Sequence, residues 1–409
     1  MDTNRRKFIR NVAALGLLPV SYGVLAALKD EGNSAFLESK IDRIELFRYD
    51  IDIPRYFSWG TWYNRQHLFM KISSGQYYGW SEIPASVNNP ALDLTDWVKY
   101  VRSYKWLTIG GAQKLLASQQ VAGTTVSSKR LEFIEMGLLD LAGRIQEKPV
   151  VELLNLPHRG PVPGLYCILD KEIDHVKKEA QNSIEQNMAH HLKFKMYGDR
   201  ELDLKLLKTI REILGGSATI VSDVNEGYKN WESVTELASI LNEFRDNGLN
   251  AIEDPAKLNQ EQWIELQKMV GNLSLVPDAP MRPAWKGINN IKPGMGKIFN
   301  LHPSTMGSFR HTAQMANKIK EIGAQVMIGD DSLVGPGCSV WQQIAIGTGA
   351  VWVEAIEKKE DSKKYMECVI SLATSQNAEG YFAFDPKPGF GIELDTAYLK
   401  TICKTYIDV

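Results

Sequence analysis

Cysteine is scarce in this sequence of 409 residues: the four cysteines lie far apart, at Cys167, Cys338, Cys368 and Cys403. Their spacing matches no cysteine pattern of a metal site and gives no argument for a disulfide framework. We therefore expect all four to be core residues.

An excess of charge of one sign is also lacking. The chain has 47 lysine and arginine residues and 49 aspartate and glutamate residues, for a net charge of −2. Domains that bind nucleic acid usually carry a clear basic excess. The composition thus gives no electrostatic argument for a nucleic-acid partner, and small molecules are the expected ligands.

No apolar run is long enough for a stable transmembrane helix, which needs about 20 residues. The best candidate, residues 12–28, is interrupted by Pro19 and follows the basic segment RRKFIR. A basic start, a short apolar run and small residues at its end are typical of an export signal, and RRKFI resembles the twin-arginine type. We expect residues 1–28 to direct export to the periplasm; a cytoplasmic enzyme with a basic N-terminus is the alternative.

Short apolar runs recur from residue 164 onward, and each is followed by a helical pattern. The runs are GLYCIL, LKFKM, TIVSD, NAIED, LSLVPD, KIFNLH, AQVMIGD and AVWVEA. Polar residues mark the ends of all but the first run, at separations of 24 to 30 positions: Lys195, Asp223, Glu253, Asp278, His302, Asp330 and Glu354. Each separation fits one strand, one helix and two loops, so residues 164–378 are predicted to form an α/β fold, a (β/α)₈-type (TIM-like) barrel.

The segments on either side of this repeat have other patterns. Residues 39–163 contain strand-like segments at 41–53, 67–74 and 77–83 and one long helical pattern over 128–155, which predicts an α+β capping domain. Residues 379–409 again alternate strand and turn, and we expect them to return to the capping domain and complete it.

Three carboxylates, those of Asp223, Glu253 and Asp278, end consecutive strands of the predicted barrel. Active sites of such barrels lie at the carboxyl ends of the strands, and carboxylates that converge there repel one another unless a cation lies between them. Hard oxygen ligands in this number suit Mg²⁺, with Mn²⁺ as the alternative. The competing interpretation is that one or more of them caps a helix.

Lys193 and Lys195 alternate with apolar residues in the run HLKFK, which places both ammonium groups on the strand face that points into the barrel mouth. Beside a divalent cation and a second ammonium group, the pKa of Lys195 is expected to be lowered, so that its neutral amine acts as a base. Its target would be the proton α to a substrate carboxylate, while Lys193 tunes Lys195 and contacts that carboxylate. The alternative is two lysines that extend to solvent from an edge strand.

These residues form an ordered set: KFK at 193–195, DVN at 223–225, EDP at 253–255 and PD at 277–278. The set resembles the enolase superfamily and, within it, the branch of mandelate racemase and muconate-lactonising enzymes. The resemblance covers about residues 39–398. It implies one Mg²⁺ bound by Asp223, Glu253 and Asp278. It also implies a metal-stabilised enediolate, Lys195 as the acid/base of the second strand, and a homo-oligomer.

Neither of the two usual partners of that lysine is present. In the muconate-lactonising and dipeptide-epimerase relatives a lysine ends the sixth strand, where this chain has His302. In the mandelate racemase relatives a histidine follows the seventh strand, where this chain has VMIGDDSL. We expect His302 to be the second acid/base, because imidazole titrates near neutral pH; a structural histidine is the alternative. Asp330 is expected either to orient His302 or to bind a substrate hydroxyl.

In this family a loop of the first domain covers the barrel mouth and selects the substrate. The segment PRYFSWGTWYNR, residues 54–65, matches its place, with Trp59 and Trp62 available for stacking and Arg65 for binding an anion. Packing of the aromatic side chains in the domain interface is the alternative. Asn225, two residues after Asp223, is a further candidate for substrate binding.

The sequence thus predicts a Mg²⁺-dependent enzyme that abstracts the proton α to the carboxylate of a small-molecule substrate. Two bases on opposite faces favour a racemase or epimerase. A histidine that protonates a leaving group would instead give a sugar-acid dehydratase or a cycloisomerase, which are lyases. A non-catalytic carboxylate-binding barrel is the alternative outside enzyme chemistry.

Overall fold

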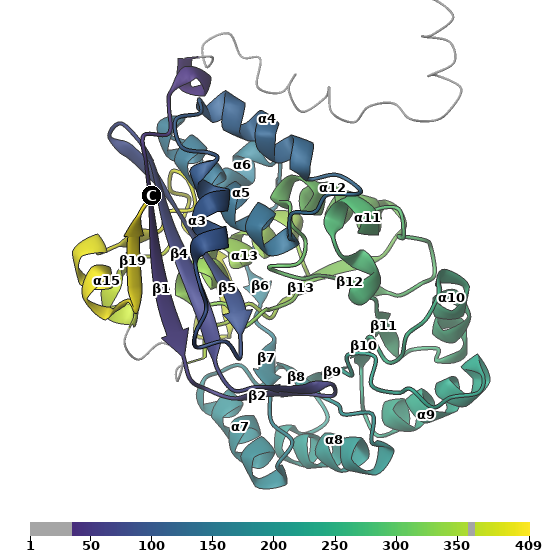
Figure 1. Ribbon diagram of the computed structural model, residues 1–409. Helices are drawn as coiled ribbons and strands as arrows, with labels where there is room; N and C mark the ends of the chain where they lie inside the picture. Colours follow the sequence, from purple (N-terminus) through teal and green to yellow (C-terminus); the bar gives the residue numbers. More distant parts are fainter. Residues whose placement is uncertain (1–34, 359–364) are drawn as a thin grey trace, which may run out of the picture.

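The computed structural model describes residues 35–358 and 365–409. The expected export signal, residues 1–28, lies outside these ranges. Within them, no helix combines the length and apolar character needed to cross a membrane. The chain forms a ring of strands and helices next to a sheet that is covered by helices (Figure 1).

The ring contains eight strands, and each apolar run of the sequence forms one of them. They are β7 (Tyr166–Ile168), β8 (His191–Lys195), β9 (Thr219–Asp223), β10 (Ala251–Glu253), β11 (Ser274–Val276), β12 (Ile298–Leu301), β13 (Gln325–Ile328) and β14 (Trp352–Val353). The parallel strands β7 to β11 are neighbours in chain order, and so are β12 to β14.

Two backbone contacts join these groups of strands into a closed ring. The amide of Asn300 donates to the carbonyl of Pro277, 3.1 Å away, between β12 and the end of β11. The amide of Leu165 donates to the carbonyl of Val353, 2.8 Å away, between β14 and the start of β7. The ring is therefore a (β/α)₈ barrel, as predicted.

Helices cover the outside of the barrel. They are α7 (Ile173–Glu185), α8 (Arg200–Leu214), α9 (Val234–Asp246), α10 (Gln260–Met269), the short α11 (Ala284–Gly287), α12 (Phe309–Glu321) and α13 (Gly335–Thr348), with the 3₁₀ turn η2 (Ala279–Met281) after β11. Side-chain caps define the starts of α8, α9, α10 and α12: for example, Asp199 accepts from two amides of α8, and Asn259 forms a capping box on α10. The helices α7, α8, α9, α10 and α12 pack an apolar face against the strands, whereas α13 is buried on all sides.

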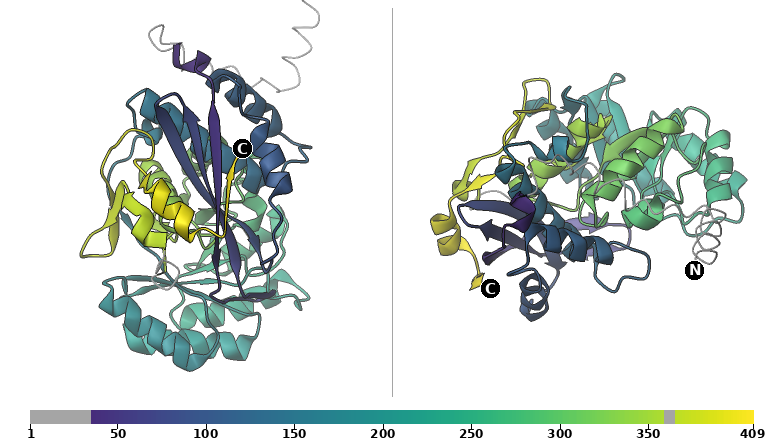
Figure 2. Two further views of the ribbon diagram at one scale, coloured as in Figure 1. Left: turned by 60° about the vertical axis from the view of Figure 1, so that its left-hand side comes forward. Right: turned by 90° about the horizontal axis from the view of Figure 1, so that it is seen from above.

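The capping domain is built on an antiparallel sheet with the strand order β19-β1-β4-β5. Its strands are β1 (Arg43–Ile51), β4 (Arg65–Ser74), β5 (Tyr77–Val87) and β19 (Thr405–Asp408), and its helices are α3 (Thr95–Arg102), α4 (Ile109–Gln119) and α5 (Ser128–Ile145), with η1 (Ala35–Glu38) at the start. The C-terminal strand lies beside the first one (Figure 2). The return of the tail to the capping domain is thus confirmed.

Not all of the tail returns to this sheet. The strand β17 (Tyr381–Phe384) pairs with β16 (Thr374–Gln376) on one side and with β6 (Val162–Pro163), which precedes β7, on the other. The strand β15 (Val369–Ser371) pairs with β18 (Glu393–Leu394). The elements η3 (Tyr365–Cys368) and α15 (Thr396–Ile402) flank them. The amide of Phe390 donates to Asp140 of α5 at 2.6 Å, so the tail also fastens that helix.

Two expectations for this part of the chain were wrong in detail. The helical pattern over 128–155 is split: α5 ends at Ile145, and α6 (Val150–Leu153) begins after Pro149. A residue before proline avoids the helical region, and Glu147 has a positive φ of 54°, so the chain turns here. All four cysteines are free, and Cys403 is only partly buried.

Candidate active site

The polar residues of the barrel mouth form one layer above an apolar one. A cluster inside the barrel contains Leu165, Val221, Ala251, Val276, Ile298, Met327 and Trp352. Because side chains alternate along a strand, the residue two positions later on each strand also points inward. That rule brings Asp223, Glu253, Asp278, Asn300 and Glu354 together in the next layer. The sequence pattern and the strand register therefore fix which polar groups face one another.

Lys193 lies at the centre of this layer. Its Nζ is 2.8 Å from Glu253 Oε2, 2.7 Å from Glu354 Oε2 and 3.4 Å from Asp223 Oδ2, and all four side chains are buried. Burial lowers the pKa of Lys193, but the surrounding carboxylates outweigh burial and hold the pKa well above its usual value. In this arrangement Lys193 is a charged group that holds the carboxylates together.

Lys195 pairs with Asp223, with 2.5 Å between Nζ and Oδ2. Burial lowers the pKa of Lys195, yet Asp223 outweighs burial and the pKa is raised. Burial likewise raises the pKa of Asp223, and the two lysines hold it well below its usual value. The expectation of a lowered pKa for Lys195 depended on a bound cation and does not describe this arrangement.

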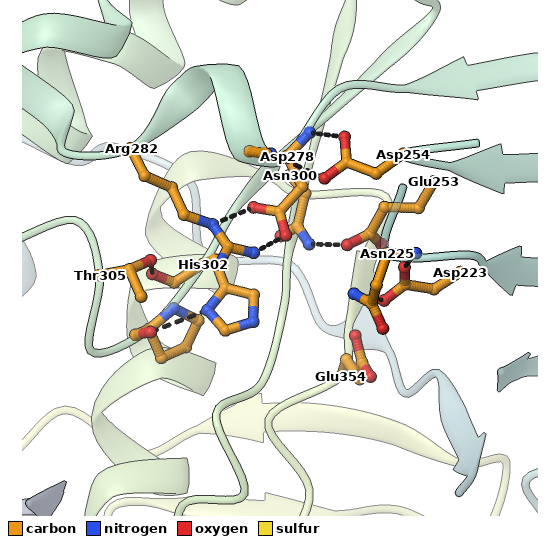
Figure 3. Close-up of polar contacts among 12 residues, drawn as sticks. Asp223, Asn225, Glu253, Asp254, Asp278, Arg282, Asn300, His302, Thr305 and Glu354 are labelled. Carbon is orange, nitrogen blue, oxygen red and sulfur yellow. Dashed lines mark hydrogen bonds and ion pairs between the residues drawn. The ribbon is translucent and has the colours of Figure 1, made fainter. Parts of the chain in front are cut away.

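Asp278 faces a different partner. Arg282 Nε donates to Asp278 Oδ1 at 2.7 Å, and Nη2 approaches Oδ2, so the guanidinium binds both oxygens (Figure 3). Asp254 fixes the backbone beside it, since its carboxylate accepts from the amides of Asp278 and Ala279 at 3.0 and 2.8 Å. The carboxylate of Asp278 is therefore buried and paired with a cation supplied by the same loop.

The donor set fits a hard divalent cation in residue type. Asp223 and Glu253 are both within 3.4 Å of one ammonium group, which places their oxygens close together. Next to them, the amide oxygens of Asn225 and Asn300 are buried and accept no hydrogen bond from the described residues. Within residues 35–358 and 365–409, no group of three or more histidine, cysteine, aspartate and glutamate side chains is arranged to hold a metal ion. Lysine and arginine groups contact the carboxylates of Asp223, Glu253 and Asp278.

His302 follows β12, across the barrel from β8. Its Nδ1 donates to the carbonyl of Pro303 at 2.9 Å, which leaves Nε2 as the acceptor of the neutral ring. Burial and the positive charge of Arg282 hold the pKa of His302 well below its usual value. Figure 3 shows His302 beside Arg282, on the other side of the site from Asp223 and Glu253. His302 is therefore placed as a neutral base.

The loop that carries His302 is held by the capping domain. Glu132 of α5 accepts from the amides of Ser304 and Gly307 at 2.6 and 3.1 Å. Three residues along the same helix, Glu135 accepts from the amide of Phe309 at 3.0 Å. Both carboxylates are buried, so α5 fixes the backbone that follows β12.

Residues 54–65 form a hairpin over the barrel mouth, made of β2 (Arg55–Phe57) and β3 (Gly60–Trp62). Its aromatic side chains pack on one another: the ring centroids of Phe57 and Trp59 are 5.0 Å apart, and those of Phe57 and Trp62 are 4.8 Å apart. The ammonium group of Lys195 lies 5.3 Å from the ring of Phe57. Phe57 thus covers the predicted base, while Trp59 is 56% exposed.

The remaining sequence candidates lie around the site in different ways. Arg65 is fully buried below the hairpin and donates to the carbonyl of Ile53. Asp330 accepts from the amide of Leu333 at 3.1 Å, and burial together with Glu354 raises its pKa to about 7. Asn225 Nδ2 donates to Asp223 Oδ2 at 3.2 Å.

Sequence reasoning missed three members of the site. Glu354 was recognised only as a strand end, and it is the closest carboxylate to Lys193 Nζ. Asn300, which donates to Glu253 Oε1 at 2.9 Å, lies two residues before His302 and could have been found by alternation. Arg282 lies in a loop and carries no periodic signal.

Comparison with known proteins gives both a family and relatives. Residues 175–398 match the family model of the enolase C-terminal domain-like proteins. Muconate cycloisomerase 1 of Acinetobacter baylyi is 23% identical over 273 residues, 66% of this chain and 71% of that protein. The N-succinylamino acid racemase of Thermus thermophilus is 20% identical over 66% of this chain and 70% of its own. Arabinonate dehydratase of Saccharolobus solfataricus is 22% identical over 66% of this chain and 72% of that protein.

Solved structures agree with this fold. A dipeptide epimerase from Cytophaga hutchinsonii, complexed with Mg and the dipeptide D-Ala-L-Val, superposes with a TM-score of 0.76 at 17% identity, covering 90% of this chain and 100% of that one. A muconate lactonizing enzyme from Pseudomonas fluorescens gives a TM-score of 0.72 at 19% identity, with coverages of 90% and 100%. Since the family model matches more than half of the chain, the protein belongs to the enolase superfamily, in the branch of mandelate racemase and muconate-lactonising enzymes.

Proposed function

We propose that the protein is a Mg²⁺-dependent isomerase that moves the proton α to a substrate carboxylate, as a racemase or epimerase. The observation that carries the proposal is the placement of two candidate bases. Lys195 ends β8 and His302 follows β12, the second and sixth strands of an eight-stranded ring, so they face the centre of the mouth from opposite sides. A carbon held between them can lose a proton on one face and gain one on the other.

The chain's own groups account for most of this chemistry. Lys195 and His302 hold or take the proton, at Nζ and Nε2. Lys193 supplies a fixed positive charge beside the carboxylates of Glu253 and Glu354. The hairpin β2–β3 limits access of water to the mouth, since Phe57 lies over Lys195.

Asp223, Glu253 and Asp278 are the residues proposed to hold the cation. When bound there, Mg²⁺ would lower the pKa of the α-proton of a carboxylate substrate, which otherwise is far above the pKa of any side chain. The dipeptide epimerase from Cytophaga hutchinsonii was solved with Mg, which supports the choice of cation.

The protonation state of His302 favours isomerisation over elimination. A dehydratase needs an acid at this position, to protonate the leaving hydroxyl group. Burial, the largest cause, lowers the pKa of His302 well below its usual value, so that the ring is neutral at pH 7 and serves as a base. The relatives include the arabinonate dehydratase, and elimination from a sugar acid is therefore the second candidate.

Proton NMR in D₂O tests the proposal. The Mg²⁺-loaded protein is incubated with separate pools of dipeptides, N-acyl amino acids, α-hydroxy acids and sugar acids, and the α-proton signals are followed. We expect one pool to lose its α-proton signal without formation of an elimination product, and EDTA to abolish the loss. Formation of a 2-keto product would establish a dehydratase instead. Absence of both reactions in every pool, with Mg²⁺ bound, would contradict enzymatic function and favour a carboxylate-binding barrel.

A further inference from the structure

Asp278 differs from the other two proposed cation ligands in its partner. Asp223 and Glu253 are paired with lysines of β8, at the centre of the barrel. Asp278 is paired with Arg282, four residues along the chain, in a bidentate contact. The guanidinium uses both carboxylate oxygens, and the carboxylate is 1% exposed.

The Arg282–Asp278 pair and a divalent cation bound at Asp278 exclude each other. A carboxylate that gives both oxygens to a guanidinium in one plane has its strongest acceptor directions occupied. A divalent cation at Asp278 would also bring its two charges next to the charge of Arg282. The backbone of Asp278 is fixed by Asp254, so the side chain of Arg282 is the part that can give way.

The surroundings of Arg282 leave room for that movement. Its side chain is 28% exposed, and it lines a pocket of about 660 Å³ between the capping domain and the loops after β11 and β12. The pocket is also lined by Lys129, Arg130, Ser304 and Thr305. The guanidinium can therefore leave Asp278 for this pocket without opening the apolar core.

We propose that Arg282 is a built-in competitor for the divalent cation: it neutralises Asp278 in the cation-free protein and is displaced from it when the cation binds. The affinity of the site for Mg²⁺ is then lowered by the free energy of breaking the Arg282–Asp278 pair. This inference rests on the proposed function, because it takes Asp223, Glu253 and Asp278 as the cation ligands.

Calorimetric titration with Mg²⁺ alone tests this inference, and it needs no substrate. Arg282→Gln removes the guanidinium, and Arg282→Lys keeps the charge without the bidentate contact. Arg130→Gln is the matched control, because it removes a positive charge from the same pocket but not from Asp278. We expect Arg282→Gln to bind Mg²⁺ at least tenfold more tightly than the wild type. The affinity of Arg282→Lys should lie between these two values, and that of Arg130→Gln should stay within about twofold of the wild type.

Two results would overturn the inference. An unchanged or weaker affinity in Arg282→Gln would mean that Arg282 does not compete with the cation. An equal gain in Arg282→Gln and Arg130→Gln would mean that only the net charge of the pocket matters. If Arg282→Gln does not fold, the ¹H–¹⁵N signal of Arg282 Nε in the wild type gives the answer: addition of Mg²⁺ should shift it, and a signal unchanged at saturation would contradict displacement.

The same titration separates this inference from the proposed function. A tighter Arg282→Gln variant in a protein that exchanges no substrate proton would support the competition and contradict the isomerase. Proton exchange that requires Mg²⁺, together with equal affinities in wild type and Arg282→Gln, would support the isomerase and contradict the competition.

Discussion

Lys195 and Asp223 are direct register partners on the neighbouring parallel strands β8 and β9, and their side chains form an ion pair of 2.5 Å inside the barrel. The candidate base thus lies one strand away from a proposed cation ligand. Binding of a cation by Asp223 would weaken its hold on the ammonium group of Lys195. In the proposed site, the protonation of Lys195 and the binding of a cation would therefore be coupled.

Replacement of Lys195 by alanine should remove the proton transfer on one face of the substrate. General acid–base groups contribute roughly 10² to 10⁴ in rate, so we expect at least a hundredfold loss of α-proton exchange in D₂O, measured by ¹H NMR. Lys177→Ala, on the exposed side of α7, serves as the control and should stay within about twofold of the wild type. Equal exchange in the wild type and Lys195→Ala would contradict the role of Lys195.

His302→Gln tests whether the site uses two bases. We expect racemisation to fall at least about a hundredfold, while the enantiomer deprotonated by Lys195 keeps exchanging its α-proton. His311→Gln, on the helix that follows the same loop, is the control, because the contacts of the His311 ring are with Ser308 and Trp285, outside the proposed site. Chiral chromatography and NMR of each pure enantiomer give the two rates. An equal loss for both enantiomers would point to a structural role for His302.

Glu132 should make the stability of the protein depend on pH. Burial raises its pKa from the usual 4.5 to about 8, so the folded state binds a proton that the unfolded state has released above pH 4.5. This contribution to stability is complete below pH 4.5 and is lost as the pH rises to about 8, with a size of a few kcal/mol. Urea denaturation at pH 5, 7 and 9 measures it. Glu132→Gln should lack this part of the slope, and an equal slope in both proteins would exclude Glu132 as its source.

Gly79 lies where β5 and α5 approach each other most closely. A Cβ atom at this position would lie 2.3 Å from the carbonyl oxygen of Gly137 and 2.5 Å from the amide nitrogen of Leu141. Because both are backbone atoms, Gly79→Ala must displace the helix, and we expect a loss of about 1–3 kcal/mol in the free energy of unfolding. Gly216→Ala, where a Cβ meets nothing within 4 Å, should be close to neutral. Similar denaturation midpoints for the two variants would contradict the close contact.

The barrel could be predicted from the sequence because its signal is local and repeated. Each strand is an apolar run that ends near a polar residue, and the period of 24 to 30 positions leaves room for one helix each time. The break before Pro149 was missed, since the apolar spacing continues on both sides of it. Pro149 itself, directly after Glu147 and Lys148, was a usable signal, because a proline restricts the residue before it.

The site was less predictable than the barrel. The polar strand ends predicted Asp223, Glu253 and Asp278, and alternation placed the two lysines of β8 on the inner face. Neither pattern could show that Lys193 would contact three carboxylates, which lie on β9, on β10 and directly after β14. Those contacts depend on closure of the ring, which joins strands far apart in the chain. The pairing of Arg282 with Asp278 depends on the path of one loop, and no spacing rule describes it.

Two neighbouring strands of the capping sheet, β1 and β19, come from opposite ends of the described residues. Arg43 of β1 bonds to Asp408 of β19 across 365 positions, and every residue of the barrel is synthesised between them. At roughly 5 to 20 residues per second, a ribosome needs on the order of 20 to 70 seconds to cover that distance. During this interval β1 lacks its partner strand β19, while the strand–helix units of the barrel emerge one by one. The cap is therefore the first part of the protein to appear and the last to be finished.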